Sequence, residues 1–183
     1  QALAQDNTFK IGLILPMTGQ QASTGRQIEA AARLYMAQNG DTVAGKKVEL
    51  IVKDDTSAPD VTKRIAQEMV VNDKVSVLAG FGLTPLAFAT APIATQSKTP
   101  LVVMAAATSS ITQASPFIVR TSFTLPQAVN LVTRNPANAL GLQDRGVIAE
   151  GKRADLILAR AHDSAQSKHV YVQNVWRQGI QVF

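Results

Sequence analysis

Two short loops carry the residues of this chain best suited to hold a small carboxylate. In residues 80–84 (GFGLT), glycines let the backbone pass close to a ligand, and Thr84-Pro85 has the pattern of a helix N-cap followed by proline. A helix start offers unpaired N–H groups and a partial positive charge, which favour a bound carboxylate. In residues 105–110 (AAATSS), small side chains leave backbone groups reachable, and the hydroxyls add hydrogen bonds. Thr84 is equally well explained as an ordinary helix cap.

Other candidate residues indicate structure rather than catalysis. Asp54-Asp55 is better explained as a turn that ends a strand than as a metal pair, because no third ligand of suitable spacing follows. His162 and His169 are the only histidines and fit a solvent-facing loop, since a metal site needs more ligands at defined geometry. For Phe81 the spacing leaves open a place in the core or in a pocket wall. There is no cysteine and no Walker A phosphate loop, so we expect no enzyme, no metal and no cofactor.

The chain around these loops alternates apolar strands and amphipathic helices. Such alternation with short connections predicts an α/β fold, a Rossmann-like parallel sheet with helices on both faces. Ligands of such sheets bind at loops that leave the carboxyl ends of the strands, here residues 16–25, 80–84 and 105–110. The predicted strands are residues 9–15, 47–53, 75–79 and 101–104, and the predicted helices are residues 26–38, 59–72 and 84–96.

Composition indicates a globular protein of one domain, or of one domain with an appendage. The 183 residues are 46% hydrophobic and 17% charged, and no apolar run approaches the roughly 20 residues of a membrane span. The net charge of +5 is spread along the chain without a basic stripe, so we expect no nucleic-acid binding. Ala2-Leu3-Ala4 fits a signal peptidase site, which makes residues 1–4 a signal-peptide remnant and predicts a periplasmic location. A chance alanine-rich start is the alternative.

Five stretches of the first half carry a family likeness. They are IGLILPMTGQQASTGRQIEAAARLY, KKVELIVKDDTSAPD, VLAGFGLTPLAFATAPIA, TPLVVMAAATSSIT and FIVRTSF. On these stretches, residues 9–122 resemble the type I periplasmic solute-binding proteins of ABC transporters, the Leu/Ile/Val-binding-like family. The resemblance implies one lobe of a two-lobed protein that encloses a small carboxylate, such as a branched-chain amino acid or an aromatic acid. It also implies an ABC transporter membrane permease as the partner.

The same resemblance implies the ligand contacts. Thr84 would hold the ligand carboxylate together with the backbone of the 105–110 loop, and the first loop would lie beside the ligand. The predicted ligand-binding residues are Thr84, Ala106, Ala107, Thr108, Thr18, Gln21 and Phe81.

The second half follows a different pattern. A helix over residues 125–138, with a polar loop at residues 161–168 and strand-like pieces around it, predicts a C-terminal helix and a small β-meander. Three stretches, TRNPANALGL, DRGVIAEGKRADLILAR and VWRQGIQVF, resemble the C-terminal tail of an amidohydrolase of the phosphonate pathway, the ribose 1-methylphosphonate 5-triphosphate diphosphatase type. The resemblance brings none of that family's metal ligands, and it implies turn contacts for Asp155. The predicted strand-like pieces are residues 146–149, 154–158, 170–176 and 180–183.

The two resemblances together predict a chimera. Residues 1–4 are the signal-peptide remnant, residues 5–123 the first lobe, and residues 124–183 the amidohydrolase-like tail. The sequence at the join fits both the lobe and the tail. We expect a partial substrate-binding component of an ABC transporter; an inactive fusion or scaffold and a hydrolase fragment are the alternatives. Apolar surface left by an absent second lobe favours a dimer. The sequence is equally compatible with a natural fusion, with an engineered fusion, and with two unrelated sequences that were joined by error.

Overall fold

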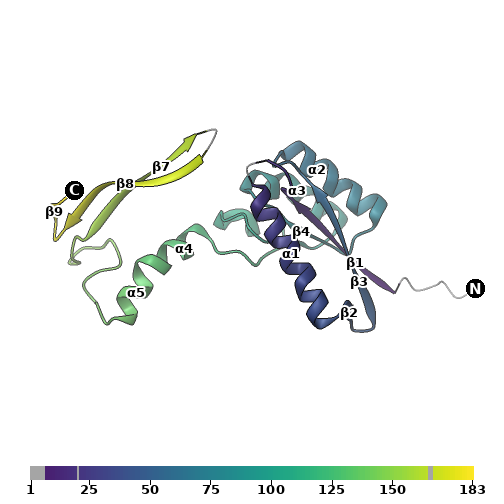
Figure 1. The fold of residues 1–183 in the computed structure, drawn as a ribbon, viewed down its shortest axis with the longest axis horizontal. Coiled ribbons are helices and arrows are strands. Elements are labelled where there is room, and N and C mark those ends of the chain that lie inside the picture. The colour runs from purple at the N-terminus through teal and green to yellow at the C-terminus, as the bar shows by residue number, and fades with distance from the viewer. Residues whose placement is uncertain (1–6, 20, 165–166) are drawn as a thin grey trace, which may run out of the picture. The chain divides into compact units, whose positions relative to one another are not determined.

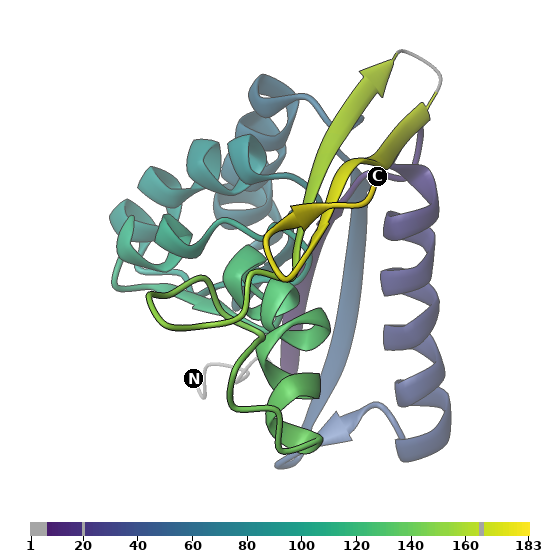
Figure 2. The same ribbon diagram turned by 90° about the vertical axis from the view of Figure 1, so that its left-hand side faces the viewer.

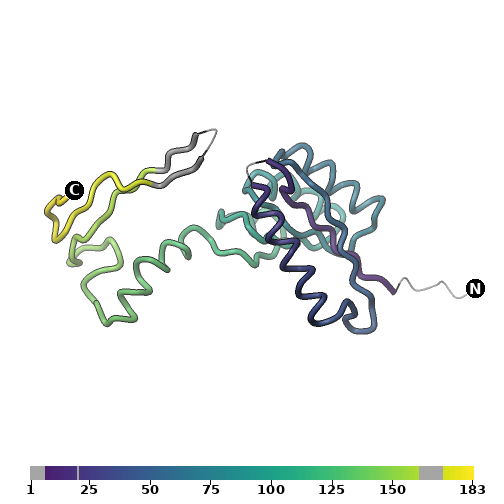
Figure 3. Tube along the Cα trace, in the orientation of Figure 1, coloured from purple at the N-terminus to yellow at the C-terminus, as the bar shows by residue number. Residues whose placement is uncertain are grey.

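The computed structural model describes residues 7–19, 21–164 and 167–183, and side chains outside residues 161–170 (Figure 3). The chain forms two compact units, Gln1–Leu125 and Pro126–Phe183. The signal-peptide remnant expected at residues 1–4 and the side chains of His162 and His169 lie outside the described part. Within that part, no helix is long and apolar enough to cross a membrane.

The first unit is built on a six-stranded sheet in the order β2-β3-β1-β4-β5-β6 (Figure 1). Neighbouring strands are parallel throughout, except that the short β2 pairs antiparallel with β3. The predicted parallel sheet is thereby confirmed, with β2 and β6 as strands that hydrophobic patterning did not indicate. The strands are β1 (Thr8–Leu15), β2 (Thr42–Val43), β3 (Lys46–Asp54), β4 (Val77–Gly80), β5 (Leu101–Val103) and β6 (Ile118–Arg120).

Helices cover both faces of this sheet, as Figure 2 shows. One face carries α1 (Ala22–Asn39), and the other carries α2 (Pro59–Glu68) and α3 (Thr84–Ser97). Alternate residues of β1 supply the two layers, because successive side chains of a strand point to opposite faces. Ile14 packs with α2 and α3, whereas Leu13 and Leu15 pack beneath α1.

The start of α1 differs from the prediction and shortens the first ligand loop. The helix begins at Ala22 rather than at residue 26. Gly25 permits this earlier start, because a Cβ at this position would lie 2.3 Å from the Pro16 carbonyl oxygen. The first turn of α1 therefore packs directly on the chain that leaves β1, at a distance that only glycine permits.

The second predicted helix is interrupted near its end. α2 stops at Glu68 and continues as a π-helical turn, η1 (Met69–Asp73). Lys53 of β3 fixes this turn, because its Nζ lies 2.9 Å from Glu68 and 2.6 Å from Asp73. The change to i→i+5 hydrogen bonds in this turn is a backbone feature that apolar periodicity does not reveal, so periodicity alone predicted one continuous helix.

The second unit consists of two short helices and an antiparallel sheet in the order β7-β8-β9. The single helix predicted over residues 125–138 is wrong, because the chain breaks at Thr133, where φ is −127° and ψ is −86°. Residues 146–149 form no strand, and the predicted polar loop at 161–168 is largely strand. The elements are α4 (Leu125–Val132), α5 (Arg134–Ala139), β7 (Leu156–Ser164), β8 (Ser167–Arg177) and β9 (Ile180–Gln181).

The two units differ in how much apolar surface they bury. The first unit has an extended core that includes Phe81, Met69 and Ile111, each fully buried. In the second unit, Ala137 is the only buried residue among those whose burial is described. Its hydrophobic side chains are largely exposed, for example Val132 at 78% and Ile148 at 89%. The side chains of the second unit that the structure describes therefore form no core of their own.

Candidate functional site

The loops after β4 and β5 meet at the carboxyl edge of the sheet through a pair of hydroxyls. Thr84 Oγ1 lies 2.8 Å from Thr108 Oγ1, within hydrogen-bonding distance. Thr84 is the first residue of α3, and Leu83 rather than Thr84 occupies the N-cap position. No side chain caps this helix. The alternative of Thr84 as an ordinary helix cap is therefore wrong, and its hydroxyl is directed to the neighbouring loop.

Phe81 contributes its backbone to this edge. It has a positive φ of 67°, and its side chain is fully buried in the core. Its N–H donates to the Ile14 carbonyl at 3.1 Å, and its carbonyl accepts the Ala106 N–H at 3.0 Å. Gly80 has a φ of 122°, and a Cβ there would lie 2.1 Å from the Ile14 oxygen. The tight turn after β4 thus ties β1 and β5 together beneath the hydroxyl pair.

The loop after β5 is held by a residue that the sequence did not single out. Arg120, the last residue of β6, donates from Nη1 to the Ala106 carbonyl at 2.5 Å and from Nη2 to the Thr108 carbonyl. The Ser122 hydroxyl also donates to the Ala106 carbonyl, at 3.0 Å. The available signal was a charged residue at the end of an apolar run (FIVR), which does not reveal bonds to carbonyls.

Of the predicted backbone donors in this loop, two remain unused. The Ala106 N–H is bonded to Phe81, and Ala106 itself is buried. Within residues 7–19, 21–164 and 167–183, the N–H groups of Ala107 and Thr108 have no hydrogen-bond acceptor. Both residues are half-buried, so a small ligand at this edge can reach them.

The first loop is fastened to the end of β3. The Thr18 hydroxyl donates to Asp54 Oδ2 at 2.6 Å, and the Met17 N–H donates to Asp54 Oδ1 at 2.9 Å. Gln21 is the N-cap residue of α1 and makes no capping bond with its side chain. Thr18 and Gln21 thus lie on one loop at the carboxyl edge of the sheet, after β1.

The acidic pair that ends β3 makes turn contacts. Asp54 Oδ1 accepts the Thr56 N–H at 2.9 Å, and Asp55 Oδ1 accepts the Ser57 N–H at 2.9 Å. Asp55 is fully buried and also accepts the Thr62 hydroxyl at 3.2 Å. Within the described part of the chain, no group of three or more potential ligands is placed to hold a metal ion.

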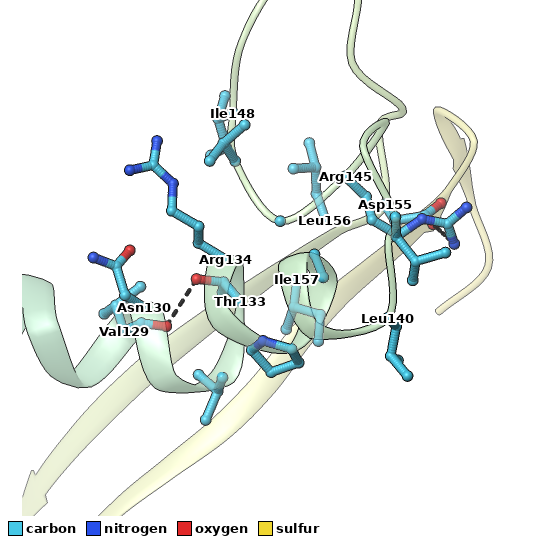
Figure 4. A pocket seen from close by; sticks show the side chains of 16 residues that line it. Val129, Asn130, Thr133, Arg134, Leu140, Arg145, Ile148, Asp155, Leu156 and Ile157 are labelled. Atoms are coloured by element: carbon cyan, nitrogen blue, oxygen red, sulfur yellow. Dashed lines mark hydrogen bonds and ion pairs between the residues drawn. The ribbon is translucent and has the colours of Figure 1, made fainter.

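A groove of about 790 Å³ lies within the second unit (Figure 4). Its lining is mainly apolar, with Val129, Leu140 and Ile148 among the side chains drawn. At its edge, Arg145 Nη1 lies 3.5 Å from Asp155. Asp155 accepts the Gln178 N–H at 2.9 Å, and this bond is the main reason that the Asp155 pKa lies below its usual value. Asp155 therefore makes structural turn contacts, and the groove offers no arrangement of catalytic groups.

The phosphonate-pathway resemblance of the second unit has a counterpart among known proteins. The Escherichia coli alpha-D-ribose 1-methylphosphonate 5-triphosphate diphosphatase is 66% identical over 61 residues, 33% of this chain and 15% of that enzyme. The predicted resemblance is confirmed over this short segment.

Larger matches are to solute-binding proteins. A Brucella abortus Leu/Ile/Val-binding protein homolog is 43% identical over 132 residues, 72% of this chain. The chain spans 34% of the length of that relative. Together with the 61 residues of the diphosphatase match, these exceed the 183 residues of the chain, so the two matches share residues near their join.

Solved structures give the same result. A Rhodopseudomonas palustris BisB5 solute-binding protein, in complex with 3,4-dihydroxybenzoic acid, is 62% identical with a TM-score of 0.69. The match covers 73% of this chain and 37% of that protein. A leucine-binding protein from Thermotoga maritima is 29% identical with a TM-score of 0.64, over 73% of this chain and 38% of that one. A family model described as "Periplasmic binding protein" matches residues 8–182, and the chain belongs to this family.

Proposed function

We propose that this chain is a partial substrate-binding component of an ABC transporter and that it holds the carboxylate of a small aromatic acid. One observation carries the proposal: over 73% of its length, the chain is 62% identical to a protein in complex with 3,4-dihydroxybenzoic acid. Its own hydroxyl pair, where the loops after β4 and β5 meet, supports it. Branched-chain amino acids are the second candidate ligands, supported by the relative named a Leu/Ile/Val-binding protein homolog.

The proposed contacts are three hydrogen-bond donors at one edge. The N–H groups of Ala107 and Thr108 donate to the carboxylate, and so does one hydroxyl of the Thr84–Thr108 pair, because the other hydroxyl proton lies between the two oxygens. The positive end of the α3 dipole adds to this attraction, because Thr84 is the first residue of a 14-residue helix. Thr18 and Gln21 lie beside the ligand. Ala106 and Phe81 act through the backbone bond that shapes the loop.

The remaining assignments follow from the same proposal. The partner is an ABC transporter membrane permease, and the location is periplasmic. Residues 5–123 are one lobe, residues 124–183 are a tail of amidohydrolase origin, and a second copy covers the apolar surface of the lobe. Because one lobe leaves much of a ligand exposed, whereas good pockets bury roughly 70–90% of it, we expect a Kd in the millimolar range.

Amide NMR titration of the intact chain tests the proposal. Added 3,4-dihydroxybenzoate should shift the resonances of Thr84, Ala107 and Thr108 in a saturable manner. Thr84→Val keeps the side-chain shape and removes one donor to a charged group, so we expect a loss of affinity of about tenfold or more. Thr112→Val is the matched control, because this exposed hydroxyl lies outside the edge.

Four other outcomes would contradict the proposal. Saturable shifts elsewhere in the chain would place the ligand at another site. A response to leucine alone would select the amino-acid alternative. No response to any carboxylate would leave the inactive scaffold as the better description, and turnover of a phosphonate ester with added zinc would favour the hydrolase fragment.

A further inference from the structure

The groove of the second unit presents apolar side chains that its own fold leaves exposed. Its lining comes from α4, α5, the loop after α5 and the start of β7, and its volume of about 790 Å³ lies within the roughly 300–1,000 Å³ of small-molecule sites. Val132, Leu140, Ile148 and Ile157 line it, and each of these side chains is more than half exposed. Because burial of apolar surface is favourable, an apolar ligand body would be stabilised in this groove.

The charges at the groove are not balanced. Arg145 is paired with Asp144 at 2.9 Å and with Asp155 at 3.5 Å, and Arg153 pairs with Asp155 at 2.8 Å. Arg134, the first residue of α5, also lines the groove. Within the described residues, the Arg134 side chain makes no ion pair and no hydrogen bond. The groove therefore carries one cation whose charge no acidic side chain of the described chain compensates.

This cation is separated from the paired charges. In the view of Figure 4, Arg134 and Asn130 lie on the left of the groove, the Arg145–Asp155 pair lies on the right, and Ile157 lies between them. The Asn130 side-chain amide offers two N–H donors, which likewise have no acceptor in the part of the chain that the structure describes. One side of the groove thus presents a positive charge and amide donors, while the lining beside it is apolar.

We propose that this groove binds a medium-chain fatty acid, with the carboxylate at Arg134 and the alkyl chain along the apolar lining. Charge complementarity favours this occupant over a neutral apolar molecule. A single guanidinium matches a monoanion better than a phosphate dianion, and it pairs with a planar carboxylate through two parallel hydrogen bonds. The groove lies wholly within residues 129–157, so this site is distinct from the edge of the first unit and goes beyond the function proposed for that edge.

Amide NMR titration of the intact chain with octanoate tests the proposal. We expect saturable shifts at Asn130, Arg134, Ile148 and Ile157, with a Kd in the millimolar range because the ligand is only partly enclosed. Full burial of one CH₂ group tightens binding by about fourfold, so decanoate, with two more, should bind about fourfold or more tightly than octanoate even when half buried. Octanamide has the same chain and no charge, and it should bind about threefold more weakly than octanoate.

Two variants separate the charge from the apolar lining. Arg134→Gln removes the charge, so the affinity for octanoate should fall about threefold while the affinity for octanamide stays unchanged. Ile148→Ala shortens a side chain that is 89% exposed, so the fold should be kept and both ligands should bind about twofold or more weakly. Arg160→Gln is the matched control: it removes the same charge from an exposed position of the same unit outside the groove, and the affinity for octanoate should not change.

Other results would overturn the inference. Octanoate shifts confined to Thr84, Ala107 and Thr108 would place this ligand at the edge of the first unit. Equal affinities for octanoate and decanoate would show that the alkyl chain makes no contact, and equal losses in Arg134→Gln and Arg160→Gln would show attraction by net charge alone. Groove resonances that move with protein concentration and not with octanoate would make a second copy the occupant. Octanoate binding in the groove without 3,4-dihydroxybenzoate binding at the edge would overturn the proposed function and leave this inference standing.

Discussion

Asp54 and Asp55 are neighbours in the chain, yet their surroundings move the two carboxyl pKa values in opposite directions. Desolvation tends to raise the Asp54 pKa, but hydrogen bonds from the Thr18 hydroxyl and from the Thr56 and Met17 N–H groups outweigh it, and the pKa is lowered. For Asp55, desolvation prevails over the bonds from Ser57 and Thr62, and the pKa is raised. The charged partner of the first ligand loop is therefore Asp54.

Replacing Asp54 should destabilise the protein in a pH-dependent way. Asp54→Asn removes a charged acceptor of three hydrogen bonds, so the free energy of unfolding near neutral pH should fall by about 1–3 kcal/mol. Because the pKa of Asp54 in the folded protein lies below its ordinary value, the stabilisation by Asp54 is complete above that ordinary value and is lost as the pH falls through the folded pKa. In urea unfolding, the difference in the free energy of unfolding between wild type and Asp54→Asn should thus become smaller as the pH is lowered into the acid range.

The control for this experiment is Asp41→Asn. Asp41 is exposed and lies 3.8 Å from Lys47, a surface pair expected to contribute little. A loss of stability in Asp54→Asn that stays constant through the acid range would show that Asp54 acts by packing rather than by charge.

At the scale of single residues, the sequence predicted the two loops that meet at the edge of the sheet but not the hydrogen bonds that hold them. Thr84 and Thr108 were predicted because their loops leave the carboxyl ends of neighbouring strands and because the family resemblance places the ligand there. Arg120 escaped because its partners are backbone carbonyls 12 and 14 residues away, and any sequence supplies carbonyls. The Ala106 N–H was predicted as a ligand donor, but it donates to the Phe81 carbonyl. This bond depends on the turn at Phe81, which apolar periodicity does not describe.

At the scale of elements, apolar periodicity predicted the parallel sheet. It did not predict where helices begin, change their hydrogen bonding or break, because glycine, proline and backbone bonds determine these points. Gly25 permits the first turn of α1 to pack on the chain that leaves β1, and the π-helical turn after Glu68 changes backbone bonding that apolar periodicity does not report. The helix predicted over residues 125–138 breaks because of Pro136. Proline lacks an N–H, and its ring clashes with the carbonyl four residues earlier, here that of Val132.

Pro136→Ala should therefore join α4 and α5. Proline in a helix interior costs about 3 kcal/mol relative to alanine, so its removal lets the helix continue through Thr133. We expect helical chemical shifts at Val132 and Thr133 and a rise in helical circular dichroism. Pro126→Ala is the matched control, since Pro126 is the second residue of α4, where proline is tolerated. If Thr133 stays non-helical in Pro136→Ala, the break has another cause.

At the scale of the whole molecule, stability is concentrated in the first unit. That unit holds nearly all the buried apolar side chains, whereas the second buries Ala137 alone among its residues of described burial. A small sheet without a hydrophobic face covered by other elements is marginal in water. The second unit should accordingly open without unfolding the first.

Hydrogen exchange of the intact chain measures this difference. Amides of β1, β4 and β5 should exchange only through global unfolding, because these strands lie inside the sheet, while amides of β8 should exchange close to their intrinsic rates in dilute solution. Protection of β8 that rises with protein concentration would mean that a second copy covers the exposed side chains, extending the proposed dimer to the second unit. Strong protection of β8 in a monomer at every concentration would contradict the prediction, because the described side chains of the second unit form no core that could supply it.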